Sequence, residues 1–271
     1  MIVVTTVQEY ENLEREGVIG FVPTMGALHS GHISLVERCR RECDTVVASI
    51  FVNPTQFNDP KDLERYPRTL EADVQMLAQA GVDVVFAPTV EQIYPEPDTR
   101  VFDFGDIERV MEGACRPGHF NGVAQVVSRL FEIVKPDKAY FGEKDYQQLA
   151  IIRLMTEQLG VGVEIVGCRI VRHTDGLALS SRNMLLNKEQ RAAAPEIYKA
   201  ISAAATNMKD GTVQEIEQWV QEEIDKNSLL KCEYVTVADA ADLQAVRAGS
   251  VRHLFVAVRC GEIRLIDNIA I

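Results

Sequence analysis

The sequence predicts an α/β fold, in which a doubly wound parallel sheet with helices on both faces precedes a smaller α+β domain. Two observations lead to this prediction. Through the first two thirds of the chain, short apolar runs typical of buried strands alternate with segments of helical periodicity. After that, two helical segments and three strand candidates follow without alternation. We expect the domains to span residues 1–170 and 171–271.

The first half of the expected sheet rests on three apolar runs. Residues 18–22 and the continuous run 45–52 (TVVASIFV) are typical of strands buried on both faces. Between them, apolar residues recur at helical spacing over 33–39, and the same spacing predicts a helix over 70–78. Residues 82–86 then form the third strand candidate.

The second half continues the alternation. Residues 123–134 carry valine, leucine and phenylalanine at helical spacing, and Pro136 follows them. A short strand over 139–141, a helix over 149–155 and a strand over 163–166 come next. A connection of this kind between neighbouring strands makes them parallel.

The expected second domain contains five elements. Helical patterns cover residues 188–208 and 213–224. Strand candidates follow at 233–237, 254–258 and 264–269. Helices that precede a run of strands, without alternation, indicate a smaller α+β domain.

Composition narrows the class of protein. The chain has 271 residues and a formal net charge of −12, which argues against an extended nucleic-acid surface. No apolar run is long enough to span a bilayer, and the first residues lack the basic region of a signal peptide, so we expect a cytoplasmic protein. The six cysteines are scattered without a Cys-x-x-Cys pair, which favours buried, reduced thiols.

The most informative segment is residues 22–32 (VPTMGALHSGH), at the expected turn from the first strand into its helix. Ligands of open α/β sheets bind beyond the carboxyl ends of the strands. Glycines let the backbone approach a phosphate closely, and the helix N-terminus adds donors. His29 and His32 could donate hydrogen bonds to a phosphoryl oxygen as charge develops. A metal held directly by the two histidines is disfavoured, because their spacing spans a glycine-containing turn.

Two familiar nucleotide motifs are absent from the sequence. There is no Gly-x-x-x-x-Gly-Lys-Ser/Thr segment, which excludes a P-loop NTPase. No Gly-x-Gly-x-x-Gly follows the first strand candidate, which argues against a dinucleotide-dependent dehydrogenase.

Four further polar clusters stand at or near expected strand ends. Residues 53–57 (NPTQF) offer uncharged amides that suit hydroxyl and carboxylate groups. Residues 113–120 (GACRPGHF) place Arg116 and His119 in a loop that could be a mobile lid or a plain surface loop. Each cluster alone also has a purely structural interpretation, and their joint presence carries the argument.

The other two clusters could handle phosphates. In residues 141–148 (FGEKDYQQ), Lys144 can neutralise a phosphate, and Asp145 could cap the next helix, bind a ligand or help to place Mg²⁺. In residues 175–183 (DGLALSSRN), two hydroxyls and a guanidinium in a row suit a triphosphate.

Taken together and in this order, six segments resemble the pantothenate synthetase (pantoate–β-alanine ligase) family, and the closing residues 264–268 (RLIDN) also fit. The segments are residues 23–32 (PTMGALHSGH), 51–57 (FVNPTQF), 65–69 (RYPRT), 118–120 (GHF), 141–145 (FGEKD) and 177–183 (LALSSRN). The resemblance covers nearly the whole chain. It implies a Rossmann-like first domain, a smaller lid domain and a homodimer.

The resemblance also implies a two-step reaction that consumes ATP. Pantoate attacks the α-phosphorus to give pantoyl adenylate and pyrophosphate, and β-alanine then displaces AMP to give pantothenate. In the family, His32 has a proton-donor role, supported by His29 and Lys144. The implied ATP-binding residues are Met25, Gly26, Ala27, Leu28, His29, Ser30, Gly31, His32, Gly142, Glu143, Lys144, Asp145, Val171, Leu179, Ser180, Ser181 and Arg182.

Pantoate is expected at Gln56, Gln148 and Asn53, and β-alanine near Gln56. Mg²⁺ would bridge the phosphates, with Asp73 nearby. Three other functions compete with this one. A nucleotidyltransferase that transfers a nucleotide to a phosphate would need more Arg and Lys around the acceptor. Gln56 and Gln148 instead suit hydroxyl and carboxylate groups. A non-catalytic nucleotide sensor would not need the paired histidines, and a metal hydrolase would lose its activity to chelators without depending on a carboxylic acid.

Overall fold

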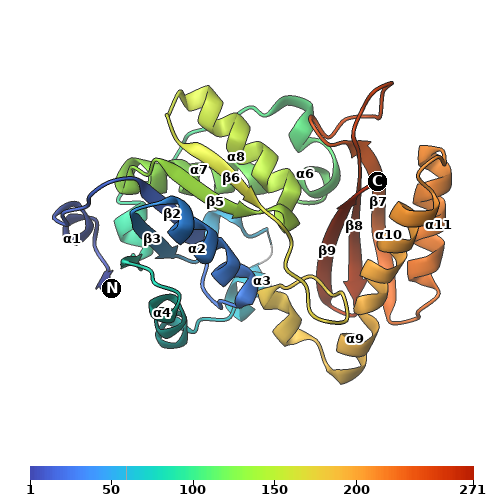
Figure 1. The fold of residues 1–271 in the computed structure, drawn as a ribbon, viewed down its shortest axis with the longest axis horizontal. Coiled ribbons are helices and arrows are strands. Elements are labelled where there is room, and N and C mark those ends of the chain that lie inside the picture. Colours follow the sequence, from blue (N-terminus) through green and yellow to red (C-terminus); the bar gives the residue numbers. More distant parts are fainter. Residues whose placement is uncertain (59) are drawn as a thin grey trace.

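The computed structural model describes residues 1–58 and 60–271, and it confirms the predicted fold class. Six strands form one sheet in the order β1-β4-β3-β2-β5-β6, and every pairing is parallel (Figure 1). The strands are β1 (Ile2–Val4), β2 (Ile19–Thr24), β3 (Thr45–Ile50), β4 (Val84–Phe86), β5 (Lys138–Gly142) and β6 (Glu164–Cys168).

Alternate side chains of the strands enter two separate cores. Phe21 of β2 packs on one face of the sheet, whereas its neighbour Val22 packs on the other. Val47 and Val46 of β3 divide in the same way, which explains why these runs are apolar throughout. The covering helices are α1 (Val7–Glu11), α5 (Val90–Ile93), α7 (His119–Val134) and α8 (Tyr146–Leu159) on the first face, and α2 (Ser30–Glu42) and α4 (Leu70–Gln79) on the second.

The strand order has a switch point between β2 and β5. From β2 the chain proceeds outward through β3 to β4, and it returns to place β5 on the opposite side of β2. The loops after β2 and β5 therefore diverge from neighbouring strand ends, which is where open α/β sheets form ligand crevices. Residues 25–29 and 143–145 lie in these two loops.

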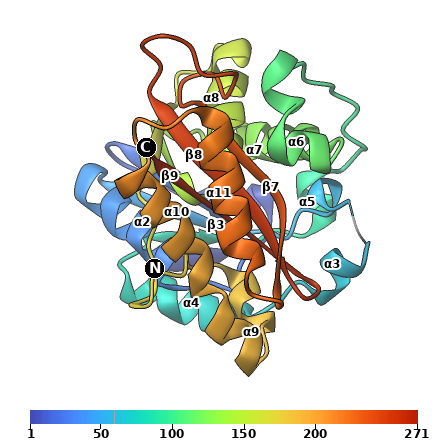
Figure 2. The same cartoon turned by 90° about the vertical axis from the view of Figure 1, so that its right-hand side faces the viewer.

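A three-stranded antiparallel sheet closes the chain, in the order β7-β8-β9. Two helices pack on one of its faces (Figure 2), and the other face lies against α6 (Met111–Cys115) and α8. The elements are α10 (Pro195–Asn207), α11 (Val213–Asp225), β7 (Leu230–Asp239), β8 (Arg252–Cys260) and β9 (Ile263–Ala270).

The single helical segment expected over 188–208 is wrong in one respect. The structure divides it into α9 (Lys188–Ala193) and α10, with Pro195 as the first residue of α10. Proline lacks the N–H that a continuous helix needs and is well suited to a first helical position.

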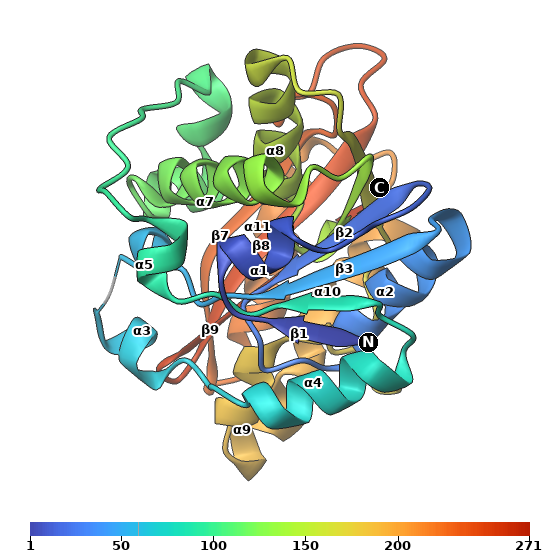
Figure 3. The same ribbon diagram turned by 90° about the vertical axis from the view of Figure 1, so that its left-hand side faces the viewer.

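Several short elements were not predicted. Among them are β1, which pairs with β4 at the edge of the sheet (Figure 3), and helix α1 after it. The others are α3 (Pro60–Arg65), α5, α6 and four 3-10 turns, η1 (Pro54–Gln56), η2 (Gly105–Glu108), η3 (Glu143–Asp145) and η4 (Ser181–Leu185). Segments of three to six residues carry too little periodicity to be distinguished from loops.

Two expectations from composition can be compared with the structure. None of the helices among the described residues is long and apolar enough to cross a membrane. All six cysteines are free thiols, and five are buried, but Cys115 is exposed, so the expectation of burial is wrong there.

Candidate active site

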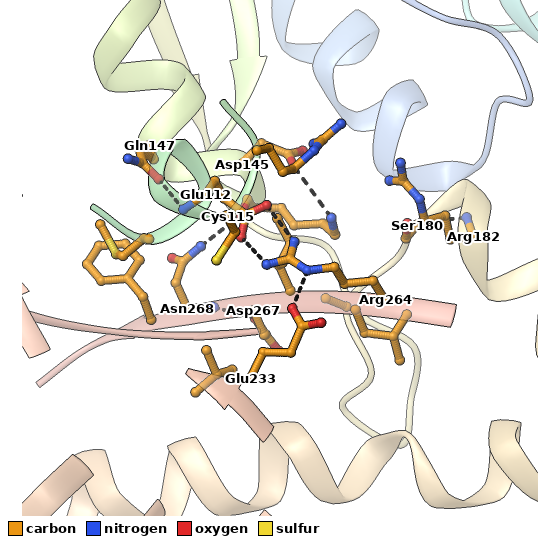
Figure 4. Close-up of a pocket in the computed structure, with 18 of the residues that line it drawn as sticks. Glu112, Cys115, Asp145, Gln147, Ser180, Arg182, Glu233, Arg264, Asp267 and Asn268 are labelled. Atoms are coloured by element: carbon orange, nitrogen blue, oxygen red, sulfur yellow. Dashed lines mark hydrogen bonds and ion pairs between the residues drawn. The ribbon is translucent and has the colours of Figure 1, made fainter. Parts of the chain in front are cut away.

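Two adjoining cavities open at the carboxyl ends of β2 and β5. The inner cavity, of about 250 Å³, is lined by the histidine turn, η1, one side of α7 and residues 179–182. The outer cavity, of about 550 Å³, lies between this region and the C-terminal sheet (Figure 4). The residues shared by both linings are Arg116, His119, Lys144, Asp145, Gln148, Ser180 and Arg182.

The turn before α2 is held open by a buried carboxylate. Asp73, only 2% exposed, accepts hydrogen bonds from the backbone N–H groups of Ala27 at 2.9 Å and Leu28 at 2.8 Å. Gly26 has φ +78°, and a Cβ there would lie 3.0 Å from the Asp73 carboxylate. Asp73 therefore has a structural partner for each oxygen, and these bonds support the turn between β2 and α2.

His29 and His32 face the inner cavity with defined tautomers. The Nδ1 atom of His29 accepts the N–H of Gly31 at 3.1 Å, and Nδ1 of His32 accepts the N–H of His29 at 3.3 Å. An imidazole that accepts at Nδ1 carries its proton on Nε2 when it is neutral. The two rings, 4.0 Å apart, thus leave two Nε2–H donors for a ligand.

Burial keeps both rings neutral. Desolvation, followed by the charge of Lys144, lowers the pKa of His29 to about 4. Desolvation, with His29 and Lys144 adding to it, lowers the pKa of His32 to about 3. At neutral pH, each ring can therefore donate a hydrogen bond but has no imidazolium proton to transfer.

Gly31 is required by the packing of the first histidine. A Cβ at Gly31 would lie 2.8 Å from Cε1 and Nδ1 of His29. Any side chain here would displace the ring, so the spacing His-x-Gly-His has a direct steric reason.

Gln56 is fixed in the inner cavity by its neighbours. Its Oε1 accepts from Nδ2 of Asn53 at 3.2 Å, and its backbone carbonyl meets Nδ1 of His119 at 2.7 Å and Nη2 of Arg116 at 3.3 Å. Asn53 is 1% exposed, and its amide also donates to Gly122. Asn53 therefore supports Gln56 and also lines the inner cavity.

Cationic and hydroxyl groups gather where the cavities meet. Lys144 lies 3.6 Å from Asp145, and Arg182 pairs with Asp62 at 3.1 Å. The Oγ of Ser181 donates to the carbonyl of Ala27 at 3.0 Å and so joins the serine loop to the histidine turn. Asp145 precedes α8 but makes no side-chain cap, so the capping role considered for it is wrong.

Most of the expected site residues meet around the inner cavity. Those that line it are Met25, His29, Gly31, His32, Asn53, Gln56, Gly142, Lys144, Asp145, Gln148, Val171, Leu179, Ser180, Ser181 and Arg182. Those that line neither cavity are Gly26, Ala27, Leu28, Ser30, Asp73 and Glu143. The backbone groups of Ala27 and Leu28 are turned toward Asp73.

Sequence reasoning gave no role to several other lining residues. Val123, Val126 and Val127 of α7 form an apolar wall of the inner cavity, although their spacing suggested only a core helix. Tyr66 also lines it, and its motif had been noted without a role. Others are Pro23, Thr24, Leu35, Phe51, Leu130, Tyr140, Arg169 and Ile170.

An interdomain ion-pair cluster in the outer cavity was missed altogether. Arg264 of β9 contacts both oxygens of Glu112 of α6, at 2.6 and 2.8 Å, and donates from Nε to Glu233 at 2.5 Å (Figure 4). Tyr234 adds a bond to Glu112 at 2.9 Å. These residues lie far apart in the sequence, so no local motif could predict that they meet.

Comparisons with known proteins agree with this arrangement. A model of the Pantoate-beta-alanine ligase family matches residues 2–270. The pantothenate synthetase of Porphyromonas gingivalis ATCC 33277 is 56% identical over 254 residues, which cover 93% of this chain and 90% of that protein. The crystal structure of pantothenate synthetase from Thermus thermophilus superposes with a TM-score of 0.94 at 49% identity and covers 99% of both chains.

A third relative was solved with ligands. The pantoate-beta-alanine ligase of Francisella tularensis, complexed with beta-gamma ATP and beta-alanine, has a TM-score of 0.86 and 37% identity, over 100% of this chain and 97% of that one. The family model and these relatives together show that the chain belongs to the pantoate–β-alanine ligase (pantothenate synthetase) family, the enzymes that use ATP to make pantothenate from pantoate and β-alanine.

Proposed function

We propose that the chain joins pantoate to β-alanine by way of pantoyl adenylate, formed in the inner cavity. The observation that carries this proposal is the meeting of two neutral Nε2–H donors, of His29 and His32, with Lys144 and the amides of Gln56 and Gln148 around one cavity. Such a site offers hydrogen-bond donors to a phosphoryl group, and beside them it offers uncharged amides that can bind a hydroxy acid.

In the first step, a carboxylate oxygen of pantoate bonds to the α-phosphorus of ATP, and the bond from that phosphorus to the bridging oxygen of pyrophosphate breaks. Charge grows on the phosphoryl oxygens, and His29 and His32 would donate hydrogen bonds to them. Lys144 and Arg182, with Ser180 and Ser181, would hold the phosphates. The Francisella relative was solved as a complex with beta-gamma ATP and beta-alanine, which supports ATP and β-alanine as substrates of this chain.

Pantoate would lie between the amides of Gln56 and Gln148 and the apolar side of α7. Its carboxylate and hydroxyls need hydrogen-bond partners, whereas its methyl groups suit the wall formed by Val123 and Val127. In the second step, the amine of β-alanine, near Gln56, attacks the acyl carbon; AMP leaves and the amine loses a proton. The C-terminal sheet would shield the adenylate from water.

The residues present fit Mg²⁺ only as an ion carried by the nucleotide. Both oxygens of Asp73 accept backbone hydrogen bonds, and within residues 1–58 and 60–271 no group of three His, Cys, Asp or Glu side chains could hold a metal. Magnesium keeps several waters and commonly binds substrate phosphates. Asp145, which is half-exposed at the phosphate side, is the carboxylate best placed to contact such a hydrated ion.

The organisation of the protein completes the proposal. We retain a domain boundary between residues 170 and 171, supported by the end of β6 at Cys168 and by a separate C-terminal core that begins at Leu177. We also propose a homodimer, by its resemblance to the family, and a cytosolic location.

ATP–pyrophosphate exchange with Mg²⁺, across a panel of carboxylic acids and without any amine, tests the adenylate route. Exchange that requires pantoate but not β-alanine is expected, and His32→Ala should slow it by more than about tenfold. Absence of exchange in a folded protein that still makes pantothenate would exclude a free adenylate step.

A further inference from the structure

The C-terminal sheet reaches directly into the loop that carries Lys144. Asn268 of β9, which is 4% exposed, donates from Nδ2 to the carbonyl of Glu143 at 3.0 Å and to the carbonyl of Lys144 at 2.9 Å (Figure 4). Both hydrogens of one amide group are thus used on two successive peptide groups. These peptide groups form η3, the single turn between β5 and α8.

The direction of the Asn268 amide is determined by its surroundings. If the amide were reversed, its oxygen would face two carbonyl oxygens, which repel it. In the observed direction, Oδ1 of Asn268 lies 2.8 Å from Nε2 of His253, so His253 must carry a proton on that nitrogen. The ring of His253 is itself packed at 4.5 Å against Tyr146, the first residue of α8.

The backbone of Asn268 is held as firmly as its side chain. Its N–H donates to Asp267 at 2.8 Å, and Asp267 receives both Nη atoms of Arg172, at 2.5 and 2.8 Å. The side chain of Asp267 is only 4% exposed. Asn268 is therefore a rigid contact of the second domain on the phosphate-side loop of the first.

We propose that Asn268 is a positioning residue, which aims Lys144 at the phosphates by fixing the two peptide groups on either side of it. This inference rests on the proposed phosphate role of Lys144. A lysine ammonium on a four-carbon stem has many rotamers, so the direction of its Cα–Cβ bond decides how often it reaches the phosphates. His253 supports this role through the amide oxygen of Asn268.

A double-mutant cycle separates positioning from general stabilisation. Asn268→Ala should lower kcat/KM for ATP in pantoate-dependent exchange by about 10- to 100-fold, because a small displacement of a positioned group has such effects. In a Lys144→Ala background, the same change should cost less than about twofold, since nothing is left to aim. His253→Gln, which retains a donor near the same place, should be milder than His253→Leu.

Tyr234→Phe provides the matched control. Tyr234 also lies on the C-terminal sheet and bonds across to the first domain, at Glu112, but it does not contact η3. Its loss should change exchange by less than about twofold. Thermal unfolding shows whether each variant is folded. If exchange in the double variant is too slow to measure, the dissociation constants of ATP for the four proteins are compared in the same cycle.

The possible failures can be told apart. Near-normal exchange with Asn268→Ala, or an equal loss with and without Lys144, would overturn the positioning role. Near-normal exchange with Lys144→Ala would instead show that the phosphate role of Lys144 is wrong, and the inference would fall with it. A loss of exchange in Tyr234→Phe as large as in Asn268→Ala would reduce Asn268 to one of several interdomain contacts.

Discussion

At the scale of single residues, the most consequential finding is that the two site histidines are neutral. We predict that neither His29 nor His32 titrates between about pH 5.5 and 8, because burial lowers their pKa values to about 4 and about 3. Ring ¹⁵N NMR should show the Nε2–H tautomer for both throughout this range. A midpoint near 6.5 for either ring would contradict the desolvated geometry.

The same pKa shifts have a consequence for stability. An unfolded histidine binds a proton below about pH 6.5, whereas these buried rings do not, and His119, with a pKa lowered to about 4 by burial and Arg116, behaves alike. The unfolded state then holds more protons, so the free energy of unfolding should fall as the pH drops from about 6.5 toward 4. Each such proton corresponds to about 1.4 kcal/mol per pH unit.

Gln148 offers a second residue-scale prediction. It lines both cavities, and as an uncharged amide it suits a carboxylate or hydroxyl more than a triphosphate. Gln148→Ala should raise KM for pantoate by about tenfold and leave KM for ATP within about twofold, as expected for a lost hydrogen bond to a charged group. Steady-state kinetics with each substrate varied in turn measures this, and a larger effect on ATP would show that the pantoate pocket is misplaced.

Residues that line the inner cavity were easier to predict than the residues that hold them in place. His29, Gln56 and Lys144 stand in short motifs at strand ends, where their chemistry can be inferred from sequence. Asn268 acts on a loop 124 positions earlier in the chain. Such a contact follows from strand register and the docking of one sheet against another element, and neither is visible in local spacing.

At the scale of elements, α4 supports the turn between β2 and α2. Asp73→Asn should lower the free energy of unfolding by about 1–3 kcal/mol, because the amide leaves one buried backbone N–H facing another donor. Chemical denaturation without Mg²⁺ measures this effect. The Mg²⁺ concentration for half-maximal exchange should stay unchanged, and a large increase would restore Asp73 as a metal ligand.

A matched control lies on the same helix. Glu71 is exposed in the first turn of α4, and Glu71→Gln should change stability by less than about 0.5 kcal/mol. If both variants lost the same free energy of unfolding, the effect would come from removing a negative charge near the N-terminus of α4. The contacts of Asp73 with the loop would then not be its cause.

The strongly patterned elements of the fold were predictable, whereas their interruptions were not. β3 is short but lies within a continuous apolar run, and α7 is long and strongly patterned; both were located closely. The break at Pro195 was overlooked, because apolar spacing continues from α9 into α10 across it. Ala194 retains helical angles at the junction, so the periodic pattern is preserved although one backbone hydrogen bond is lost.

At the scale of the whole molecule, the C-terminal sheet meets the first domain through polar contacts and one small apolar cluster. That cluster contains Met111, Ala238, Leu243 and Phe255, and the polar contacts centre on Arg264 and Glu112 (Figure 4). Although burial opposes it, the Arg264 guanidinium holds the pKa of Glu112 below its usual value. An ion pair so enclosed helps to fix the relative placement of the domains, together with the Asn268 amide and the apolar cluster.

Breaking this pair from one side should be costly. In Arg264→Met, Glu112 remains buried without its partner, and the free energy of unfolding should fall by about 3–5 kcal/mol. Adding Glu112→Gln should recover part of this loss, because the buried charge is then removed. Arg259 pairs with the other acceptor, Glu233, but is 48% exposed, so Arg259→Met should cost less than about 1 kcal/mol. Equilibrium denaturation of the four proteins decides between a buried interdomain pair and a surface one. Equal losses in Arg264→Met and Arg259→Met would mean that water reaches Glu112 and that its pair with Arg264 is worth no more than an exposed one.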